Sequence, residues 1–150
     1  HFICQRIYYR SNLIMNKDKL NELYSKYNLA KDTDFWSKKM GGRTFTIVTR
    51  SGIEKIQNQE QINVSYDALV TEKDFAVVKA IAEKENKRIE TYSSALKGTG
   101  GNCFTSYVVE MAEKRAFARA VLKLTDFYQE NVFGEDESDD FKQKINVIKQ

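Results

Sequence analysis

The sequence contains no proline, one histidine and two cysteines, and each scarcity excludes a class of protein. Without proline, Pro-rich linkers, polyproline ligands and collagen-like segments are excluded. The single histidine is His1, so a Ser–His or Cys–His nucleophilic site, or a His-rich metal site, would lack its base. Cys4 and Cys103 show no paired spacing, which argues against a disulfide scaffold and a Cys-type zinc site. An enzyme would have to use carboxylates, lysine or tyrosine alone, so the composition favours a binding protein.

Long apolar runs are also missing. No stretch of about 20 apolar residues occurs, which excludes a membrane-spanning helix. Gln5, Arg6 and Arg10 interrupt the apolar residues of His1–Ile14, so this segment does not match a signal peptide and we expect a cytoplasmic protein. Met15 is followed by a polar segment that is typical of a natural N-terminus, so we interpret residues 1–14 as an N-terminal extension of the domain. The alternative is that residues 1–14 form an edge strand.

The length of 150 residues predicts one domain with a single core, which we place at residues 15–133. Residues 134–150 form an acidic tail that holds five acids in one short run, Glu135, Asp136, Glu137, Asp139 and Asp140. The formal net charge is +3, so the rest of the chain carries +8. The tail is either a solvated exit from the fold, or a phosphate mimic that competes with nucleic acid for the basic body or docks a partner.

Apolar periodicity and turn residues predict an α+β fold, with an antiparallel β-meander backed by one long C-terminal helix and an N-terminal helix alongside. A capping box beginning at Ser51 starts a short helix. Polar turns at Thr71–Asp74 and Glu83–Lys87 separate three strands that should pair in sequence order. The expected helices are Asn16–Asn28, Gly52–Gln61 and Phe104–Asp126, and the expected strands are Arg43–Arg50, Ile62–Val70, Phe75–Ala82 and Arg88–Leu96.

The long C-terminal helix carries the most informative pattern. Arg115, Arg119 and Lys123 fall on one stripe at i, i+4 and i+8. The residues four positions before them are Met111, Arg115 and Arg119, so no acid balances the stripe within the helix. Cations repelling one another at this spacing favour an anion between them, which points to phosphate contact. A solvated charged face is the alternative. Three alanines beside the stripe would allow close approach to a sheet or another subunit: Ala112, Ala116 and Ala120.

Other features are weaker signals of nucleic-acid binding. The glycine-rich loop Gly98–Asn102 lacks the Gly-Lys-Ser/Thr of a P-loop, so we expect a flexible strand-to-helix connection. Phe35 and Trp36, with Lys38, Lys39 and Arg43 nearby, form a mixed aromatic and basic patch. Six aromatic residues are candidates for base stacking, although core packing is the more common role of each: Tyr8, Tyr9, Tyr66, Tyr92, Phe104 and Tyr107.

Carboxylates that could hold a metal are sparse. Asp32 with Asp34, and Glu110 with Glu113, are the closest groupings, and neither pair has a visible third ligand. No catalytic residue, metal site or cofactor is therefore predicted, although a divalent ion could assist binding to nucleic acid.

The order of elements resembles the single-strand annealing proteins, a superfamily that includes the phage Redβ, Erf and Sak types and the eukaryotic Rad fifty-two type. The likeness covers Phe75–Phe127. Phe75–Ile81 is similar to the strand that leads into the family's hairpin, and Arg88–Ala95 to the returning strand. Met111–Leu122 resembles the helix whose alanines and cations line the DNA groove, with Arg119 at the groove-lining basic position.

The resemblance implies an ATP-independent, ring- or filament-forming homo-oligomer of phage or mobile-element origin that holds single-stranded DNA in a basic groove. Two positions depart from the pattern: Ala118 replaces a second cation, and Ser93 replaces a glycine. We therefore expect single-stranded DNA binding, with annealing of complementary strands in recombination. Arg115, Arg119 and Lys123 would neutralise phosphates, and the outer contributors would be Lys114, Arg43 and Arg50.

Two other functions stay open at this stage. One is a protein-interaction or inhibitor module of mobile-element origin, whose acidic tail binds a basic partner. The other is a small metal-dependent nuclease or nucleotide-processing enzyme that uses Glu110 and Glu113.

Overall fold

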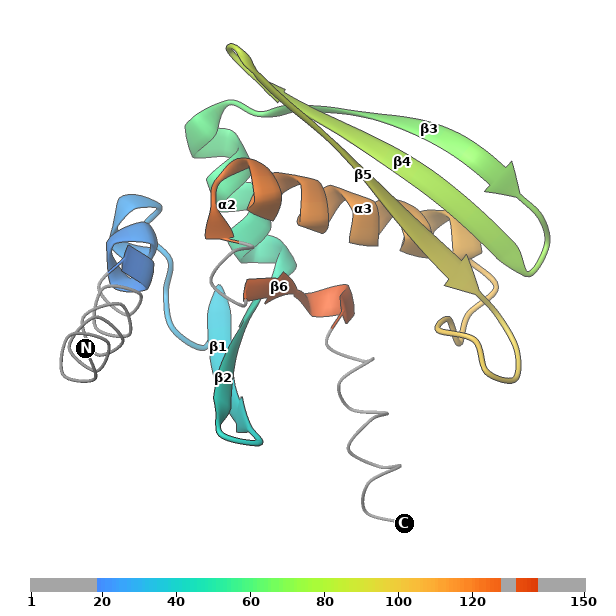
Figure 1. The fold of residues 1–150 in the computed structure, drawn as a ribbon, viewed down its shortest axis with the longest axis horizontal. Helices are drawn as coiled ribbons and strands as arrows, with labels where there is room; N and C mark the ends of the chain where they lie inside the picture. The colour runs from blue at the N-terminus through green and yellow to red at the C-terminus, as the bar shows by residue number, and fades with distance from the viewer. Residues whose placement is uncertain (1–18, 128–131, 138–150) are drawn as a thin grey trace, which may run out of the picture.

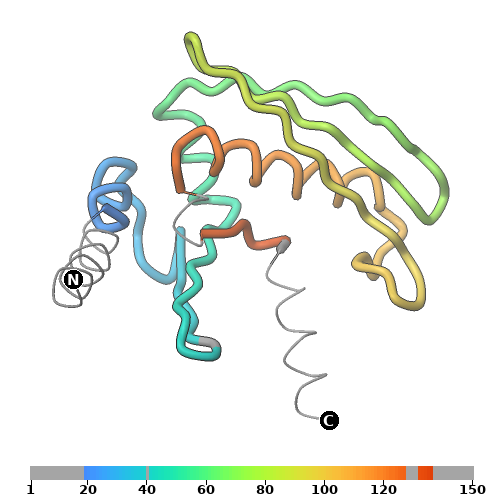
Figure 2. Tube along the Cα trace, in the orientation of Figure 1, coloured from blue at the N-terminus to red at the C-terminus, as the bar shows by residue number. Residues whose placement is uncertain are grey.

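The structure is a computed structural model that describes residues 19–127 and 132–137 (Figures 1 and 2). Two three-stranded sheets flank the long helix α3. No helix in these residues is long and apolar enough to cross a membrane. The elements are β1 (Phe35–Met40), β2 (Arg43–Val48), α2 (Arg50–Glu60), β3 (Asn63–Thr71), β4 (Phe75–Lys84), β5 (Lys87–Leu96), α3 (Val108–Leu124), β6 (Val132–Gly134) and the 3-10 helix η2 (Glu135–Glu137).

The predicted α+β fold with an antiparallel meander is confirmed. Strands β3, β4 and β5 pair in sequence order, and β4 and β5 form a hairpin that closes at the pair Lys84 and Lys87. Glu85 in that turn has a positive φ of 49°, so two residues suffice to reverse the chain. The sheet arches over α3 (Figure 1). Alternate residues of β4 face the core: Ala76, Val78, Ala80 and Ala82.

The alanine stripe of α3 packs under this sheet, as its small side chains predicted. Ala112, Ala116 and Ala120 are fully buried, and α3 contacts both β4 and β5. The hydroxyl of Thr91 on β5 donates a hydrogen bond of 2.8 Å to the carbonyl of Ala116, which bridges strand and helix directly. Because alanine adds so little volume, the helix backbone lies close enough for this bond to form.

Helix α3 begins at Val108 rather than at the predicted Phe104. The backbone N–H of Cys103 donates to the carbonyl of Leu96, and an isolated bridge joins Lys97 to Cys103. These contacts hold the loop against β5. Beyond them, the thiol of Cys103 donates to the carbonyl of Thr105 and the N–H of Tyr107 donates to the Thr105 hydroxyl, so residues 103–107 form local turns ahead of the helix.

A second sheet, of β1, β2 and β6, was not predicted. β1 pairs antiparallel with β2, and β6 pairs parallel with β2 on its other side. Phe35 is a packing residue rather than part of a nucleic-acid patch, since its ring stacks on Tyr24 with 3.9 Å between centroids. Gly41 and Gly42 both have positive φ values and form the turn between the strands.

Helix α2 confirms the short helix, but its cap differs from the predicted capping box. The N-cap is Thr49, whose hydroxyl accepts from the N–H of Gly52, and the helix begins at Arg50. The hydroxyl of Ser51 donates instead to the buried carboxylate of Asp34, at 2.6 Å. Ser51 therefore bonds to Asp34, which is distant in the sequence, and does not cap the helix as the local pattern predicts.

The two ends of the described chain pack on the core. Residues 19–26 are helical, whereas Asn16, the predicted cap, lies outside the described residues. Leu23 and Tyr24 pack against the cluster that contains Phe127. Residues 134–137, assigned above to the acidic tail, belong to β6 and η2, and the part of the tail beyond them lies outside the described residues.

Candidate nucleic-acid interface

A hollow of about 220 Å³ lies between the outer edge of β5 and the basic stripe of α3. It is lined by Val77, Tyr92, Ser93, Ser94, Asn102, Arg115 and Arg119. Two of the three cations of the predicted stripe therefore line the same hollow as Tyr92, one of the candidate stacking residues. Lys123, the third cation, is exposed on the last turn of the helix.

Arg115 anchors the wall of this hollow. Its side chain is buried, with only 4% of the residue exposed. One terminal nitrogen donates to the carbonyl of Ser94 at 3.1 Å, and the other donates to the carbonyl of Asn102 at 2.5 Å. Within the described residues, Nε has no hydrogen-bond partner although it is buried. The prediction that Arg115 neutralises a phosphate directly therefore needs correction: burial and two carbonyl partners make it a positioning residue.

Arg119 lies one turn further along α3, half-buried at the mouth of the hollow. Its terminal nitrogen donates to the carbonyl of Tyr92 at 2.7 Å. Four residues advance a helix by about 6 Å, and two residues advance a strand by about 6.8 Å. The near match lets arginines at i and i+4 reach alternate carbonyls of the edge strand, Ser94 and then Tyr92.

The glycine-rich loop caps the same strand edge. The side chain of Asn102 accepts from the N–H of Leu96 at 2.8 Å and donates to the carbonyl of Ser94 at 3.2 Å. A Cβ atom at Gly101 would lie 2.1 Å from the carbonyl oxygen of Leu96, so only glycine fits there. These contacts correct the expectation of a flexible connection: the loop is bonded to β5 and pairs edge groups that would otherwise be open to another strand.

Several of the candidate stacking residues are exposed. Tyr92 is 51% exposed and lines the hollow beside Arg119. Phe104 and Tyr107, between the glycine-rich loop and α3, are 76% and 66% exposed. Tyr66 on β3 is exposed as well, and burial of part of its ring raises the pKa of its hydroxyl, assisted by the negative charge of Glu113. Tyr8 and Tyr9 lie outside the described residues.

The three outer cations do not join the hollow. Arg50 and Lys114 line a separate cleft between α2 and α3, together with Glu135 and Asp136. The guanidinium of Arg50 lies over the ring of Phe117, 5.5 Å from its centroid. The cleft therefore combines two predicted cations with the first two acids of the predicted tail.

Arg43 is placed apart from both groups. It is exposed at the start of β2, where it pairs with Met40 next to the hairpin turn. Of the six predicted cations, two therefore line the hollow, two line the cleft, Arg43 lies at a hairpin end, and Lys123 is exposed on the last turn of α3.

The buried acid Asp34 has a structural role. Asp34 is fully buried, and its carboxylate accepts from Ala30 N–H, Ser51 and Lys55. Desolvation raises the pKa of Asp34, but these donors outweigh it and hold the pKa below its usual value. No group of three metal-ligating side chains occurs among residues 19–127 and 132–137.

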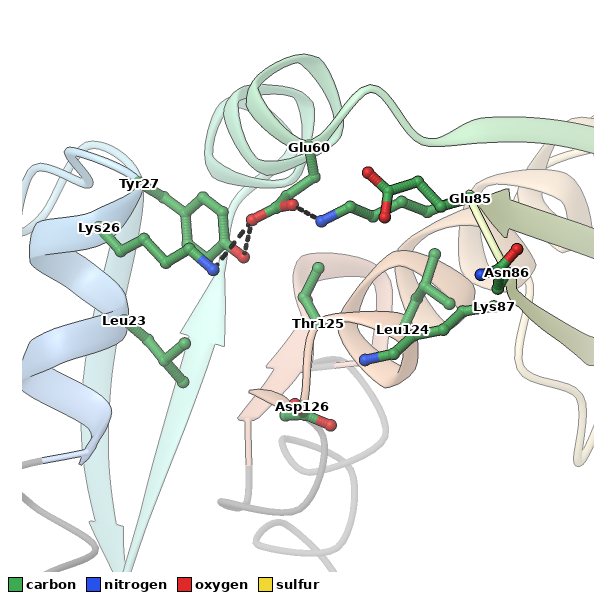
Figure 3. Close-up of a pocket in the computed structure, with 11 residues that line it drawn as sticks. Leu23, Lys26, Tyr27, Glu60, Glu85, Asn86, Lys87, Leu124, Thr125 and Asp126 are labelled. Atoms are coloured by element: carbon green, nitrogen blue, oxygen red, sulfur yellow. Dashed lines mark hydrogen bonds and ion pairs between the residues drawn. The ribbon is translucent and has the colours of Figure 1, made fainter.

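A pocket of about 380 Å³ lies between residues 23–27, the β4–β5 turn and the end of α3 (Figure 3). Glu60 is its central charge, and its carboxylate accepts from the Tyr27 hydroxyl at 2.7 Å and pairs with Lys26 at 3.1 Å. Lys84 pairs with the other carboxylate oxygen. The dashed lines in Figure 3 thus all meet at Glu60, and this part of the pocket wall is a structural ion network.

No family model, curated protein or solved structure matches the chain. The resemblance to the single-strand annealing proteins therefore stays a prediction, and a function has to be argued from the residues around the hollow.

Proposed function

We propose that this domain binds single-stranded DNA along the hollow between β5 and α3. The observation that carries the proposal is that Arg119 and the half-exposed Tyr92 line the same hollow, with the guanidinium of Arg119 held by the backbone carbonyl of Tyr92. Single-stranded nucleic acid presents the two chemistries that such a pair recognises, a phosphate and an unstacked base. Duplex DNA presents phosphates but keeps its bases stacked, so it should bind more weakly.

Each side chain has a distinct role in this proposal. Arg119 contacts a phosphate, and its bond to the Tyr92 carbonyl fixes the direction of the guanidinium before the ligand arrives. Lys123, two turns beyond Arg115 on the same helix, contacts a neighbouring phosphate. Tyr92 stacks on a base. Arg115 holds the Asn102 loop and the edge of β5 in place, so that the hollow keeps its shape.

Annealing of complementary strands and assembly into homo-oligomers are further parts of the proposal, and they rest on the resemblance described above. Annealing requires strands held by their backbones while bases remain available for pairing. Ionic contacts from a stripe of cations meet that requirement without a nucleotide cofactor or a catalytic group.

The test is a fluorescence anisotropy titration of labelled single-stranded and duplex DNA at two salt concentrations. Arg119→Gln should weaken single-strand binding and reduce the slope of log affinity against log salt by about 0.7, the value for a single phosphate contact. Arg88→Gln is the matched control, because it removes the same charge from an exposed arginine of β5 that is paired with Glu83 and Glu90. It should leave the slope nearly unchanged.

Equal effects of the two variants would refute the placement of DNA in the hollow. Absence of binding to either form of DNA at low salt would refute the function itself. A protein partner, the alternative raised by the sequence, would then become the leading explanation of the exposed aromatic residues.

A further inference from the structure

Strand β6, which leads into Glu135 and Asp136, crosses α3 closely. β6 pairs with β2 in parallel, with Gly134 opposite Val48. A Cβ atom at Gly134 would lie 2.8 Å from the Cβ of Ala118, so glycine permits a close crossing of the helix. After this crossing, Glu135 and Asp136 lie in the cleft that Arg50 and Lys114 also line.

Glu135 is placed at the start of α2. Its carboxylate accepts from the backbone N–H of Arg50 at 3.4 Å. Arg50 is the first residue of α2, and the first turn of that helix contains no acid of its own. The N–H groups and the dipole of a helix start attract negative charge, so a carboxylate from outside the helix supplies what its sequence lacks.

Asp136 is half-buried among positive charges. Burial raises the pKa of its carboxyl, whereas the charges of Lys114, Arg115 and Arg50 act in the opposite direction. Helix N–H groups together with lysine and arginine side chains are also the groups that bind backbone phosphates in nucleic-acid complexes. The two carboxylates therefore lie in surroundings that suit two phosphates.

We propose that Glu135 and Asp136 are an intramolecular competitor that occupies part of the DNA-binding surface in the free protein. The cleft of Arg50 and Lys114 would then be a second phosphate-binding position, separate from the hollow and open to phosphates only when the acid pair leaves. Arg50 also pairs with Glu54 at 3.0 Å, so its guanidinium is held on α2 in either state. This inference rests on the proposed function, and it adds a regulation to it: the domain inhibits its own binding of single-stranded DNA.

The contact is weak enough to be displaced. The bond from Arg50 to Glu135 is long, and the carboxyl of Asp136 gives up part of its hydration on docking. Exposed ionic contacts of this kind contribute little individually. A strand that adds phosphates at the hollow and at the cleft together can therefore replace the acid pair.

The test compares three full-length proteins in binding to a labelled oligothymidylate by anisotropy. The first is the wild type, and the second carries Glu135→Gln with Asp136→Asn, which keeps size and shape but removes both charges. The control carries Glu72→Gln with Asp74→Asn, which makes the same change in net charge at exposed positions of the β3–β4 turn. We expect the second protein to bind about tenfold more tightly than the wild type, because DNA no longer has to displace two carboxylates from the cleft. The control should bind less than about twofold more tightly.

The amide NMR signal of Arg50 gives a readout that needs no variant to fold. In the wild type, saturating oligothymidylate should shift this signal, because Glu135 no longer accepts from that N–H. An unchanged Arg50 signal, or equal affinity gains in the two double variants, would overturn the inhibition while leaving the proposed function standing. Failure of all three proteins to bind at low salt would overturn both.

Discussion

Replacing Arg115 by methionine tests whether this residue positions the hollow or contacts the ligand. Methionine keeps an unbranched stem in the buried site but removes the donors to the carbonyls of Ser94 and Asn102. Hydrogen bonds from a charged donor contribute about 1.5–3 kcal/mol each. Removal of the buried, unpaired Nε relieves a desolvation penalty of about 1–3 kcal/mol. Ser94 also keeps its bond from Asn102, so its carbonyl stays paired in the variant.

The net expectation for Arg115→Met is a loss of about 2–3 kcal/mol in the free energy of unfolding. For a chain of this size, such a loss corresponds to a fall of roughly 5–10 °C in melting temperature. Urea unfolding followed by circular dichroism measures the free energy. Lys114→Met is the control, because it removes a neighbouring charge from an exposed position of the same helix and should change stability by no more than about 0.5 kcal/mol.

Hydrogen exchange locates the loss. The amides of the Gly98–Asn102 loop should exchange faster in Arg115→Met than in the control, because the anchor of Asn102 is gone. If the two variants unfold at the same urea concentration with the same exchange in the loop, Arg115 is not a positioning residue and our assignment is wrong.

Three further predictions concern the loop, the ring and the buried acid. Gly101→Ala should destabilise the fold by about 1–3 kcal/mol in urea unfolding, because its Cβ would collide with the carbonyl of Leu96, whereas the exposed Thr99→Ala should be nearly neutral. Tyr92→Ala should weaken oligothymidylate binding by roughly tenfold to a hundredfold, the effect of removing one base stack, while Tyr92→Phe should retain the affinity. The donors to Asp34 outweigh desolvation and lower its pKa in the folded protein. The contribution of Asp34 to stability is therefore complete above the ordinary carboxyl pKa of about 4. This contribution is lost as the pH falls through the lower pKa of the folded state. Below about pH 4, the free energy of unfolding of Asp34→Asn should therefore fall less steeply with decreasing pH than that of the wild type.

The meander and α3 were predictable because their signals are local. Polar turns of a few residues separate the three strands. β4 confirms the predicted strand Phe75–Ala82, an apolar run that is interrupted only by Lys79. In the second sheet only β2 has a local signal, and it confirms the predicted strand Arg43–Arg50 as far as Val48. β2 finds β6 through a parallel pairing of Thr46 with Val132, which are far apart in the chain and share no turn. β1 carries two consecutive lysines and pairs through its backbone, so its sequence does not show the alternation of a half-buried strand.

The basic stripe was predicted correctly as one face of a helix, but the groups that accept hydrogen bonds from its arginines could not be predicted. The sequence shows that Arg115 and Arg119 have no acid at i−4, and we took a phosphate as the anion that balances them. The structure adds a third possibility, since backbone carbonyls at a strand edge carry partial negative charge and accept from both arginines. Arg115 is buried by this pairing, whereas Arg119, one turn further, reaches the mouth of the hollow. The bond of Arg119 to the Tyr92 carbonyl therefore pairs an edge group of β5 that another strand could otherwise bind. The same bond holds the cation at the hollow, so nucleic-acid binding would use a side chain that is already fixed for a structural reason.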